Sequence, residues 1–186
     1  MRKSFGVKPI TYPQPVYIIA SYAEDGTPDA MNAAWGGISE ENEISICVSA
    51  NHKTTKNILA SGAFTVSMAD EAHMVACDYV GIVSANDVPD KFARAGFHAT
   101  PSALVNAPLI DELPVAVVCR LVHYDEATCR LVGEILDVCA EEHVLDAQGK
   151  IDPHKLRPII FDPVHHAYLA IGDKVGDAFK DGLQLK

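Results

Sequence analysis

Apolar and polar positions alternate with a period of two along much of this chain, as they do in half-buried β-strands. Residues 44–48 show this alternation, and residues 63–68 repeat it. Further β-type runs cover residues 15–22, 113–124, 128–138, 157–161 and 168–172. Asp25-Gly26 and the acidic link at residues 125–127 are typical of hairpin turns. The pattern therefore predicts an antiparallel sheet built largely from hairpins.

Helical patterns are short and lie between the β-type runs. We expect helices at residues 57–60, 69–80 and 86–95, ended by Gly62, Gly81 and Gly96 respectively. The segment 29–38 predicts a strand rich in small residues, which favours either tight strand packing or a flat ligand against the main chain. Short helical inserts among six or more β-runs predict a mainly β, antiparallel barrel. Without a repeat or linker, residues 1–186 are expected to form one domain.

The composition is that of a folded protein with an acidic surface. Hydrophobic residues make up 48% of the chain and charged residues 22%, and the net charge is −10. This charge disfavours nucleic acids and anionic membranes as partners. The basic N-terminus is not followed by the apolar stretch of a signal peptide, so we expect a cytoplasmic protein.

The five cysteines are odd in number and include no Cys-x-x-Cys pair. This argues against a disulfide framework and a zinc ribbon, and favours buried thiols. The ten-residue spacing of Cys119, Cys129 and Cys139 leaves open a reactive pair across a hairpin.

The loop at residues 48–59 concentrates hydroxyl, amide and basic side chains between an apolar strand and an apolar helix. His52, Lys53 and Lys56 lie within five residues, beside Thr54 and Thr55. Free backbone N–H groups at the helix start would meet these side chains, which is an arrangement suited to phosphate. The alternative is a surface helix with solvated lysines.

Common catalytic and metal motifs are absent. The chain has no GxGxxG, GxxxxGK[ST], HExxH or GxSxG. His165 and His166 lie near Asp162, but adjacent strand residues point to opposite faces, so they are not expected to share a metal ion. His143 beside Glu141 and Glu142 is the other candidate, and no metal site is predicted.

Several short sequence segments follow one another in a particular order along nearly the whole chain. They are residues 31–38, the loop from Ser49 to Ile58, residues 62–67, residues 78–84 followed by Asp87 to Phe92, and residues 158–161. In this order they resemble the flavin reductase-like family of FMN-binding split barrels, to which the flavoredoxins belong. The most specific piece is the Gly-x-x-Ser insert followed by Asp-Lys-Phe, which a generic barrel does not require.

The resemblance implies a Greek-key split β-barrel that forms a homodimer and holds FMN near the subunit interface. By position, Lys53, Thr54 and Thr55 would hold the phosphate, Lys91 would reach the flavin or its phosphate, and Trp35 would lie beside the ring. The implied cofactor-binding residues are Asn32, Ala33, Ala34, Trp35, Ser49, Ala50, Lys53, Thr54, Thr55, Asn57, Ser84, Lys91 and Phe161.

Each of these residues also has a structural interpretation. Trp35 and Phe161 could fill the core or an interface, Lys91 could be solvated, and Ser84 could be a helix cap. Two positions depart from the family: Asp29 stands where it often has Asn, and His52 where it often has Arg. An aspartate near an anionic cofactor is unfavourable, so Asp29 either points away or weakens flavin binding.

The resemblance further implies an oxidoreductase in which NAD(P)H gives a hydride to the flavin and a flavin or protein acceptor takes the electrons. No catalytic side chain is named, since the flavin itself carries this chemistry. Two alternatives stay open. One is a non-enzymatic FMN electron carrier between protein partners. The other, suggested by Asp29, is a split barrel that has lost its cofactor and serves as an interaction module.

Overall fold

The computed structural model describes residues 1–186, and most of the ordered chain is strand. The strands are β1 (Gln14–Pro15), β2 (Tyr17–Tyr22), β3 (Pro28–Ala33), β4 (Gly36–Glu40), β5 (Glu43–Cys47), β6 (Ala63–Met68), β7 (Ala99–Pro101), β8 (Pro108–Ile110), β9 (Val115–Asp125), β10 (Arg130–Ala140), β11 (Ile159–Asp162) and β12 (Ala167–Ala170). The helices are α1 (Lys53–Ser61), α2 (Met74–Ile82), α3 (Lys91–Arg94), α4 (Pro153–Leu156) and the 3-10 turns η1 (Glu142–Val144) and η2 (Asp181–Leu185).

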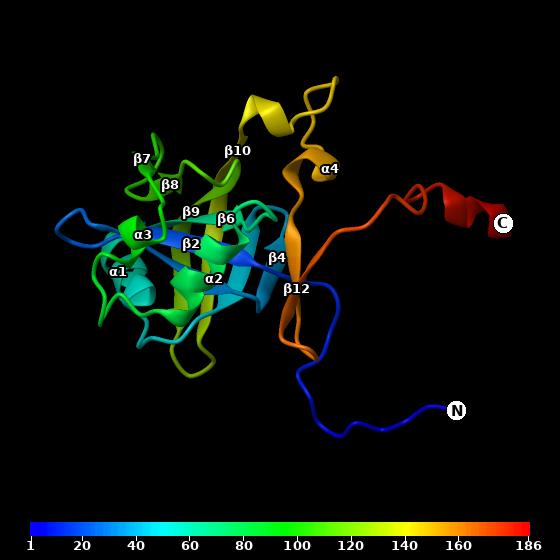
Figure 1. Ribbon diagram of the computed structural model, residues 1–186, viewed down its shortest axis with the longest axis horizontal. Coiled ribbons are helices and arrows are strands. Elements are labelled where there is room, and N and C mark those ends of the chain that lie inside the picture. The colour runs from blue at the N-terminus through cyan, green and yellow to red at the C-terminus, as the bar shows by residue number, and fades with distance from the viewer.

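A curled, seven-stranded antiparallel sheet forms the body (Figure 1). Its strand order is β3-β2-β6-β9-β10-β5-β4, so the long β9–β10 hairpin lies between the N-terminal hairpin and the β4–β5 hairpin. A small sheet, β1-β11-β12, flanks it, and β7 pairs with β8. The mainly β, antiparallel architecture predicted from the sequence is confirmed.

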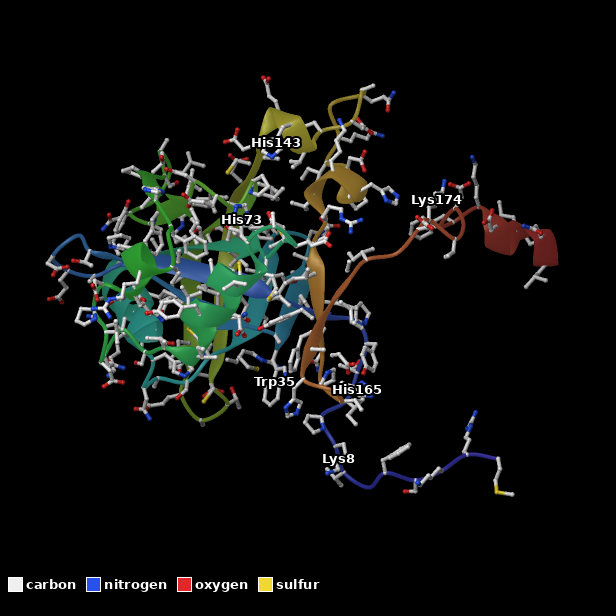
Figure 2. The ribbon with its side chains drawn as sticks, in the orientation of Figure 1. Lys8, Trp35, His73, His143, His165 and Lys174 are labelled. Carbon is white, nitrogen blue, oxygen red and sulfur yellow. The ribbon has the colours of Figure 1, made fainter.

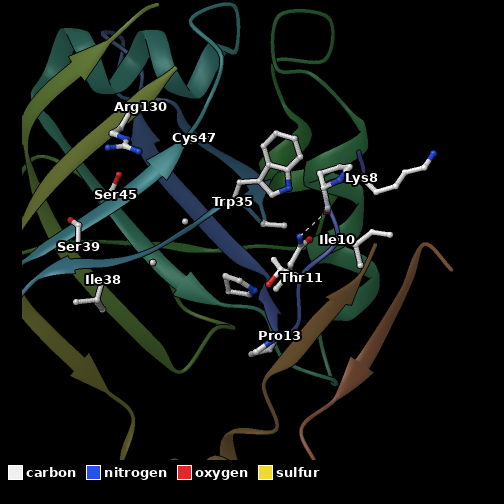
Figure 3. A pocket seen from close by; sticks show the side chains of 16 residues that line it. Lys8, Ile10, Thr11, Pro13, Trp35, Ile38, Ser39, Ser45, Cys47 and Arg130 are labelled. Atoms are coloured by element: carbon white, nitrogen blue, oxygen red, sulfur yellow. Dashed lines mark hydrogen bonds between the residues drawn. The ribbon is translucent and has the colours of Figure 1, made fainter. Parts of the chain in front are cut away.

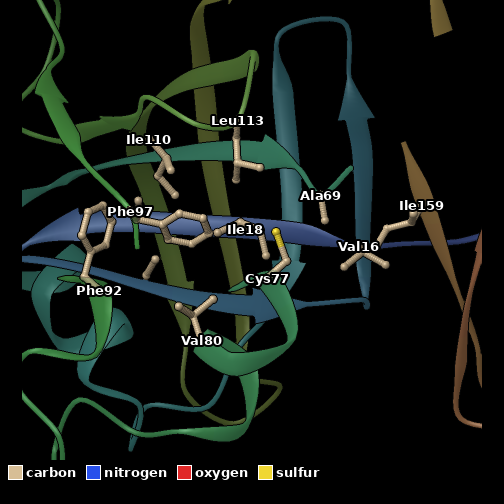
Figure 4. Close-up of a cluster of buried hydrophobic side chains, with 12 residues drawn as sticks. Val16, Ile18, Ala69, Cys77, Val80, Phe92, Phe97, Ile110, Leu113 and Ile159 are labelled. Carbon is tan, nitrogen blue, oxygen red and sulfur yellow. The ribbon is translucent and has the colours of Figure 1, made fainter. Parts of the chain in front are cut away.

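Alternation along the strands separates two apolar cores. In β2, Ile18 packs with Cys77, Val80 and Phe97 between the sheet and α2, as Figure 4 shows. The next residue, Ile19, belongs to the other core, inside the curl of the sheet. Both isoleucines are fully buried, because each face of β2 is covered.

Inside the curl, the sheet packs closely around one aromatic ring. A Cβ atom at Gly133 would overlap Cζ of Phe64, a ring that is fully buried. Any side chain at position 133 would therefore displace the ring or the strand. The register of β10 also shifts between Val132 and Gly133, so the glycine lies where the strand bends.

Several element boundaries differ from the sequence-based expectation. Helix α1 begins at Lys53, four residues earlier than expected, and ends as predicted at Gly62, whose φ is 70°. Gly81 lies inside α2 and does not end it. The absence of a side chain there allows close packing against β3, since a Cβ would lie 2.8 Å from Cβ of Asn32. The segment 29–38 is two strands broken at residues 34–35.

The expectation that all five thiols are buried is wrong for Cys47, which is exposed. Cys77 and Cys119 are buried, and burial raises the pKa of each thiol to about 12. Cys129 and Cys139 are partly exposed, and Cys119 faces Ile135 across the hairpin. All five cysteines are free, so the hairpin does not bring together the pair considered from the spacing.

Both chain ends extend away from the sheet on the same side of the molecule (Figure 1). They carry exposed apolar side chains, among them Val7 and Phe179. None of the helices is long and apolar enough to cross a membrane.

Candidate functional site

Four of the predicted site residues line two depressions on the surface. The first, the Trp35 hollow, has a volume of about 680 Å³ and includes Ala34 and Trp35. The second, the Lys53 hollow, has a volume of about 460 Å³; it includes Lys53, Lys56 and Asn57, and also the acidic residues Glu24, Asp25 and Asp29. The loop at residues 48–52 connects β5, at the edge of the first hollow, to α1, at the edge of the second.

The break between β3 and β4 presents Trp35 to solvent. Its side chain is 58% exposed, while its carbonyl accepts a hydrogen bond of 2.8 Å from the N–H of Cys47. The next residue must be glycine, since a Cβ at Gly36 would lie 2.8 Å from the carbonyl oxygen of Ser45. Tight strand packing thus explains Gly36, whereas nothing lies within 4 Å of a Cβ at Gly37. Two residues without side chains therefore follow Trp35 at the edge of the hollow, which Figure 3 shows.

Helix α1 presents an anion-binding end. Its N-cap, His52, makes no side-chain cap, and its first turn contains no acidic residue. The backbone N–H groups of Lys53, Thr54 and Thr55 donate to no other group of the chain. Lys53 is half-buried and Lys56 exposed. Free N–H groups, the helix dipole and two ammonium groups together favour a phosphate or carboxylate at this end.

Beneath α1, a buried carboxylate joins three elements. Asp29 of β3, 3% exposed, accepts a hydrogen bond of 2.6 Å from the hydroxyl of Thr54. Its other oxygen lies 3.6 Å from the ammonium of Lys91, which is equally buried. That ammonium also donates to the carbonyls of Val80 and Val83, at the C-terminal end of α2, at 3.0 and 2.9 Å.

Burial lowers the pKa of Lys91, and the Asp29 carboxylate opposes that shift. The Lys91 ammonium also affects His52, which precedes α1. The pKa of His52 is lowered first by partial burial and then by this positive charge. Asp29 is therefore matched by a cation inside the protein. The Asp29 carboxylate and the Lys91 ammonium lie below the start of α1, and the hydroxyl of Thr54 connects the carboxylate to the helix.

Two loops meet in front of α1. The side-chain amide of Asn86 donates to the carbonyl of Asn51 at 3.2 Å and to the hydroxyl of Ser84 at 3.1 Å. The hydroxyl of Ser49 accepts from the N–H of Asn51 at 3.4 Å. The structure therefore brings Ser84 close to the Ser49–Ala50 loop, although more than thirty positions separate them in the chain.

Other predicted residues face the protein interior. The Asn32 amide donates to the carbonyl of Cys77 at 3.2 Å, and Ala33 belongs to the core inside the sheet. The hydroxyl of Thr55 and the amide nitrogen of Asn57 are buried without a partner. Phe161 packs against the ring of Tyr168, with ring centroids 6.2 Å apart, and pairs across the strands with Gln14.

Of the residues that line the Trp35 hollow, sequence reasoning named only Ala34 and Trp35 as site residues. Those it missed include Lys8, Gln14, Cys47 and Arg130. Arg130 is directly opposite Cys47 in the pairing of β10 with β5. This pairing joins positions that no short motif connects, so only a prediction of strand register could have found it.

The histidines considered as metal ligands have other surroundings. His165 Nδ1 lies 2.7 Å from Asp162, whereas His143 is at the opposite end of the molecule (Figure 2). No group of three or more His, Cys, Asp or Glu side chains is arranged to hold a metal ion.

Comparison with known proteins identifies relatives over the whole fold. The model of the flavin reductase like domain matches residues 10–159. The structure is similar to flavoredoxin of Desulfovibrio vulgaris (Miyazaki F), with 36% identity, a TM-score of 0.93, and coverage of 98% of this chain and 100% of that one. Flavoredoxin from Methanosarcina acetivorans is 27% identical, with a TM-score of 0.87 and coverage of 100% and 98%.

A more distant match shows the same fold. It is an FMN-binding domain of a flavin reductases-like enzyme from Shewanella baltica OS155, with 18% identity, a TM-score of 0.77, and coverage of 88% of this chain and 89% of that one. No curated protein matches the chain.

The Asp29 network generates a prediction about stability. Asp29→Asn keeps an acceptor for Thr54 but leaves the buried Lys91 ammonium without its counter-charge, so we expect a loss of about 3 kcal/mol in the free energy of unfolding. Urea unfolding at pH 7 measures this loss.

The pH dependence has a definite sign. Because the pKa of Lys91 lies below its usual value of 10.5, the unfolded chain binds the proton more tightly, and stability rises as pH approaches 10.5 from below. In Asp29→Asn this rise should begin at lower pH. Glu24→Gln, which removes an exposed carboxylate from the β2–β3 hairpin, is the control. A stability of Asp29→Asn equal to that of the control would contradict the structural role given to Asp29.

Proposed function

Because the chain belongs to the flavin reductase-like family, we propose that it binds FMN and transfers electrons from a reduced nicotinamide to a flavin or protein acceptor. The observation that carries the proposal is the start of α1, with three free N–H groups, Lys53 and no acidic residue in its first turn, together with the exposed Trp35 at the break before β4. FMN has a phosphate and a flat ring, and these two features fit the two parts of the site.

The residues present fit this cofactor. The N–H groups of Lys53, Thr54 and Thr55, with the Lys53 ammonium, would hold the phosphate. Trp35, Ala34 and Phe161 would lie along the ring, and the main chain of Ser49 and Ala50 would meet its polar edge. Asn57 and Ser84 would support the phosphate side, and Asn32 and Ala33 would support the strand behind the ring.

Lys91 acts in this proposal through its charge. Its ammonium has three oxygen neighbours inside the protein, so it offsets the negative charge of Asp29 beneath the site. When bound, FMN supplies the hydride-accepting chemistry. The protein binds and orients it, and backbone N–H donors would favour the anionic reduced form over the oxidised one.

The similarity to flavoredoxin at 36% identity favours a second candidate function. In this reading the protein is a non-enzymatic FMN carrier that exchanges electrons with protein partners. Both functions need the same FMN site, and they differ in whether a nicotinamide reacts directly.

We further propose that two copies associate through the face around Trp35. Ile38 is 67% exposed there, and an apolar groove of about 630 Å³ adjoins the Trp35 hollow. Pro13, Pro15 and Gly36 line both depressions. A second copy seated on this groove would shield the exposed apolar side chains from water and lie at one edge of the ring site.

FMN binding is tested with the only tryptophan of the chain as the reporter. We expect purified protein to be yellow, and added FMN to quench the fluorescence of Trp35 in apoprotein. Lys53→Gln should weaken FMN affinity about tenfold, because it removes a charge next to the phosphate. Lys180→Gln, in the C-terminal segment, is the control. Colourless protein whose fluorescence ignores FMN would reject the proposal.

Direct reaction with nicotinamide separates the two candidate functions. Absorbance at 340 nm, followed with free flavin present, should fall catalytically with NADH or NADPH if the protein is a reductase. An FMN carrier would remain yellow and show almost no oxidation of either nucleotide. The same assay without protein gives the background rate.

Association is measured by light scattering after size-exclusion chromatography. We expect twice the mass of one chain for the wild type and a shift towards one chain for Ile38→Asp, because a charge would be buried at the interface. Val75→Asp places the same charge on an exposed apolar position of α2 and should leave the mass unchanged. A wild-type protein of single-chain mass would refute the association.

A further inference from the structure

The Trp35 hollow has a charge opposite to that of the whole protein. Its lining includes Lys8 and Arg130 and no Asp or Glu, in a chain of net charge −10. In Figure 3 the two basic residues lie on opposite sides of Trp35. This positive cluster attracts anions to the hollow, while the net negative charge of the protein disfavours anions elsewhere on the surface.

Arg130 differs from the other arginines of the folded body. Arg94, Arg120 and Arg157 each form an ion pair with a carboxylate, at 2.8, 3.1 and 2.6 Å. Arg130 has neither an ion pair nor a side-chain hydrogen bond, and it is exposed at the start of β10. Its planar guanidinium is therefore free to bind a phosphate through two parallel hydrogen bonds.

Gln14 adds an unsatisfied acceptor to the same hollow. The residue is 4% exposed, its side-chain carbonyl has no donor, and its amide makes only a long hydrogen bond of 3.5 Å to the carbonyl of Pro9. Pairing of β1 with β11 fixes its backbone opposite Phe161. A buried carbonyl without a donor is unfavourable, and a ligand N–H would relieve this.

FMN alone does not account for Lys8, Arg130 and Gln14. FMN has one phosphate, and the start of α1 already offers that phosphate three N–H groups and Lys53. We propose, on the basis of the function proposed above, that the Trp35 hollow binds the nicotinamide donor. Arg130, assisted by Lys8, binds the donor's pyrophosphate, and the carbonyl of Gln14 accepts a hydrogen bond from its carboxamide N–H.

Arg130 and Gln14 are thus specificity-determining residues with separable effects. The test compares NADH with N-benzyl-1,4-dihydronicotinamide, which keeps the carboxamide and lacks phosphate. Arg130→Gln should raise KM for NADH on the order of tenfold and leave KM for the uncharged donor unchanged. Gln14→Leu should raise KM for both donors. Higher salt should raise the wild-type KM for NADH and not that for the uncharged donor.

FMN affinity, read from Trp35 fluorescence, and the melting temperature are measured for each variant. Both should stay at wild-type values in Arg130→Gln. The matched control is Arg120→Gln, an exposed arginine outside the hollow, which should leave both KM values unchanged. Weakened FMN binding in Arg130→Gln, or an equal change in KM with both donors, would overturn the proposal by assigning Arg130 to the flavin.

Binding of NAD⁺ to the FMN-loaded protein, measured by calorimetry, separates this proposal from the proposed function. Failure to bind FMN would refute the function itself. Protein that binds FMN but binds NAD⁺ with equal affinity in wild type and Arg130→Gln, or not at all, would refute only the donor site.

Discussion

The buried Asp29 carboxylate is the interaction on which the candidate site depends. It lies on β3, receives the hydroxyl of Thr54 from α1 and faces the ammonium of Lys91 from α3. Through Lys91 it also reaches the C-terminal carbonyls of α2. Because charged groups are stable at this depth only when paired, the four elements hold one relative position, and this fixes the free end of α1.

This network changes the role that the sequence suggests for Asp29. From the sequence, a carboxylate near a phosphate-binding loop argues against an anionic cofactor. In the structure the same carboxylate is matched by a lysine below the loop, so its charge acts mainly on Lys91 and not on a ligand above α1. The pKa of His52, at the start of α1, is lowered first by partial burial and then by the nearby Lys91 ammonium.

The two hollows differ in charge. Lys53 and Lys56 at the start of α1 share their hollow with Glu24, Asp25 and Asp29, whereas Arg130 and Lys8 lie in the Trp35 hollow, where no acid is found. Gly36 allows β4 to pair closely with β5, because a side chain there would meet the carbonyl of Ser45. A hollow with an exposed indole and two basic residues suits a planar ligand with an anionic end.

Local patterns in the sequence determined most strands of the large sheet, the hairpin turns and the glycine that ends α1, because alternation and turn chemistry act between near neighbours. They also brought the loop at residues 48–59 forward as a candidate, whereas Trp35 came from the family resemblance. The early start of α1, the pairing of Asp29 with Lys91, and the arrival of Arg130 and Gln14 beside Trp35 were decided by the tertiary structure alone. Each depends on strand register and burial between segments far apart in the chain, and these are set by packing of the whole sheet.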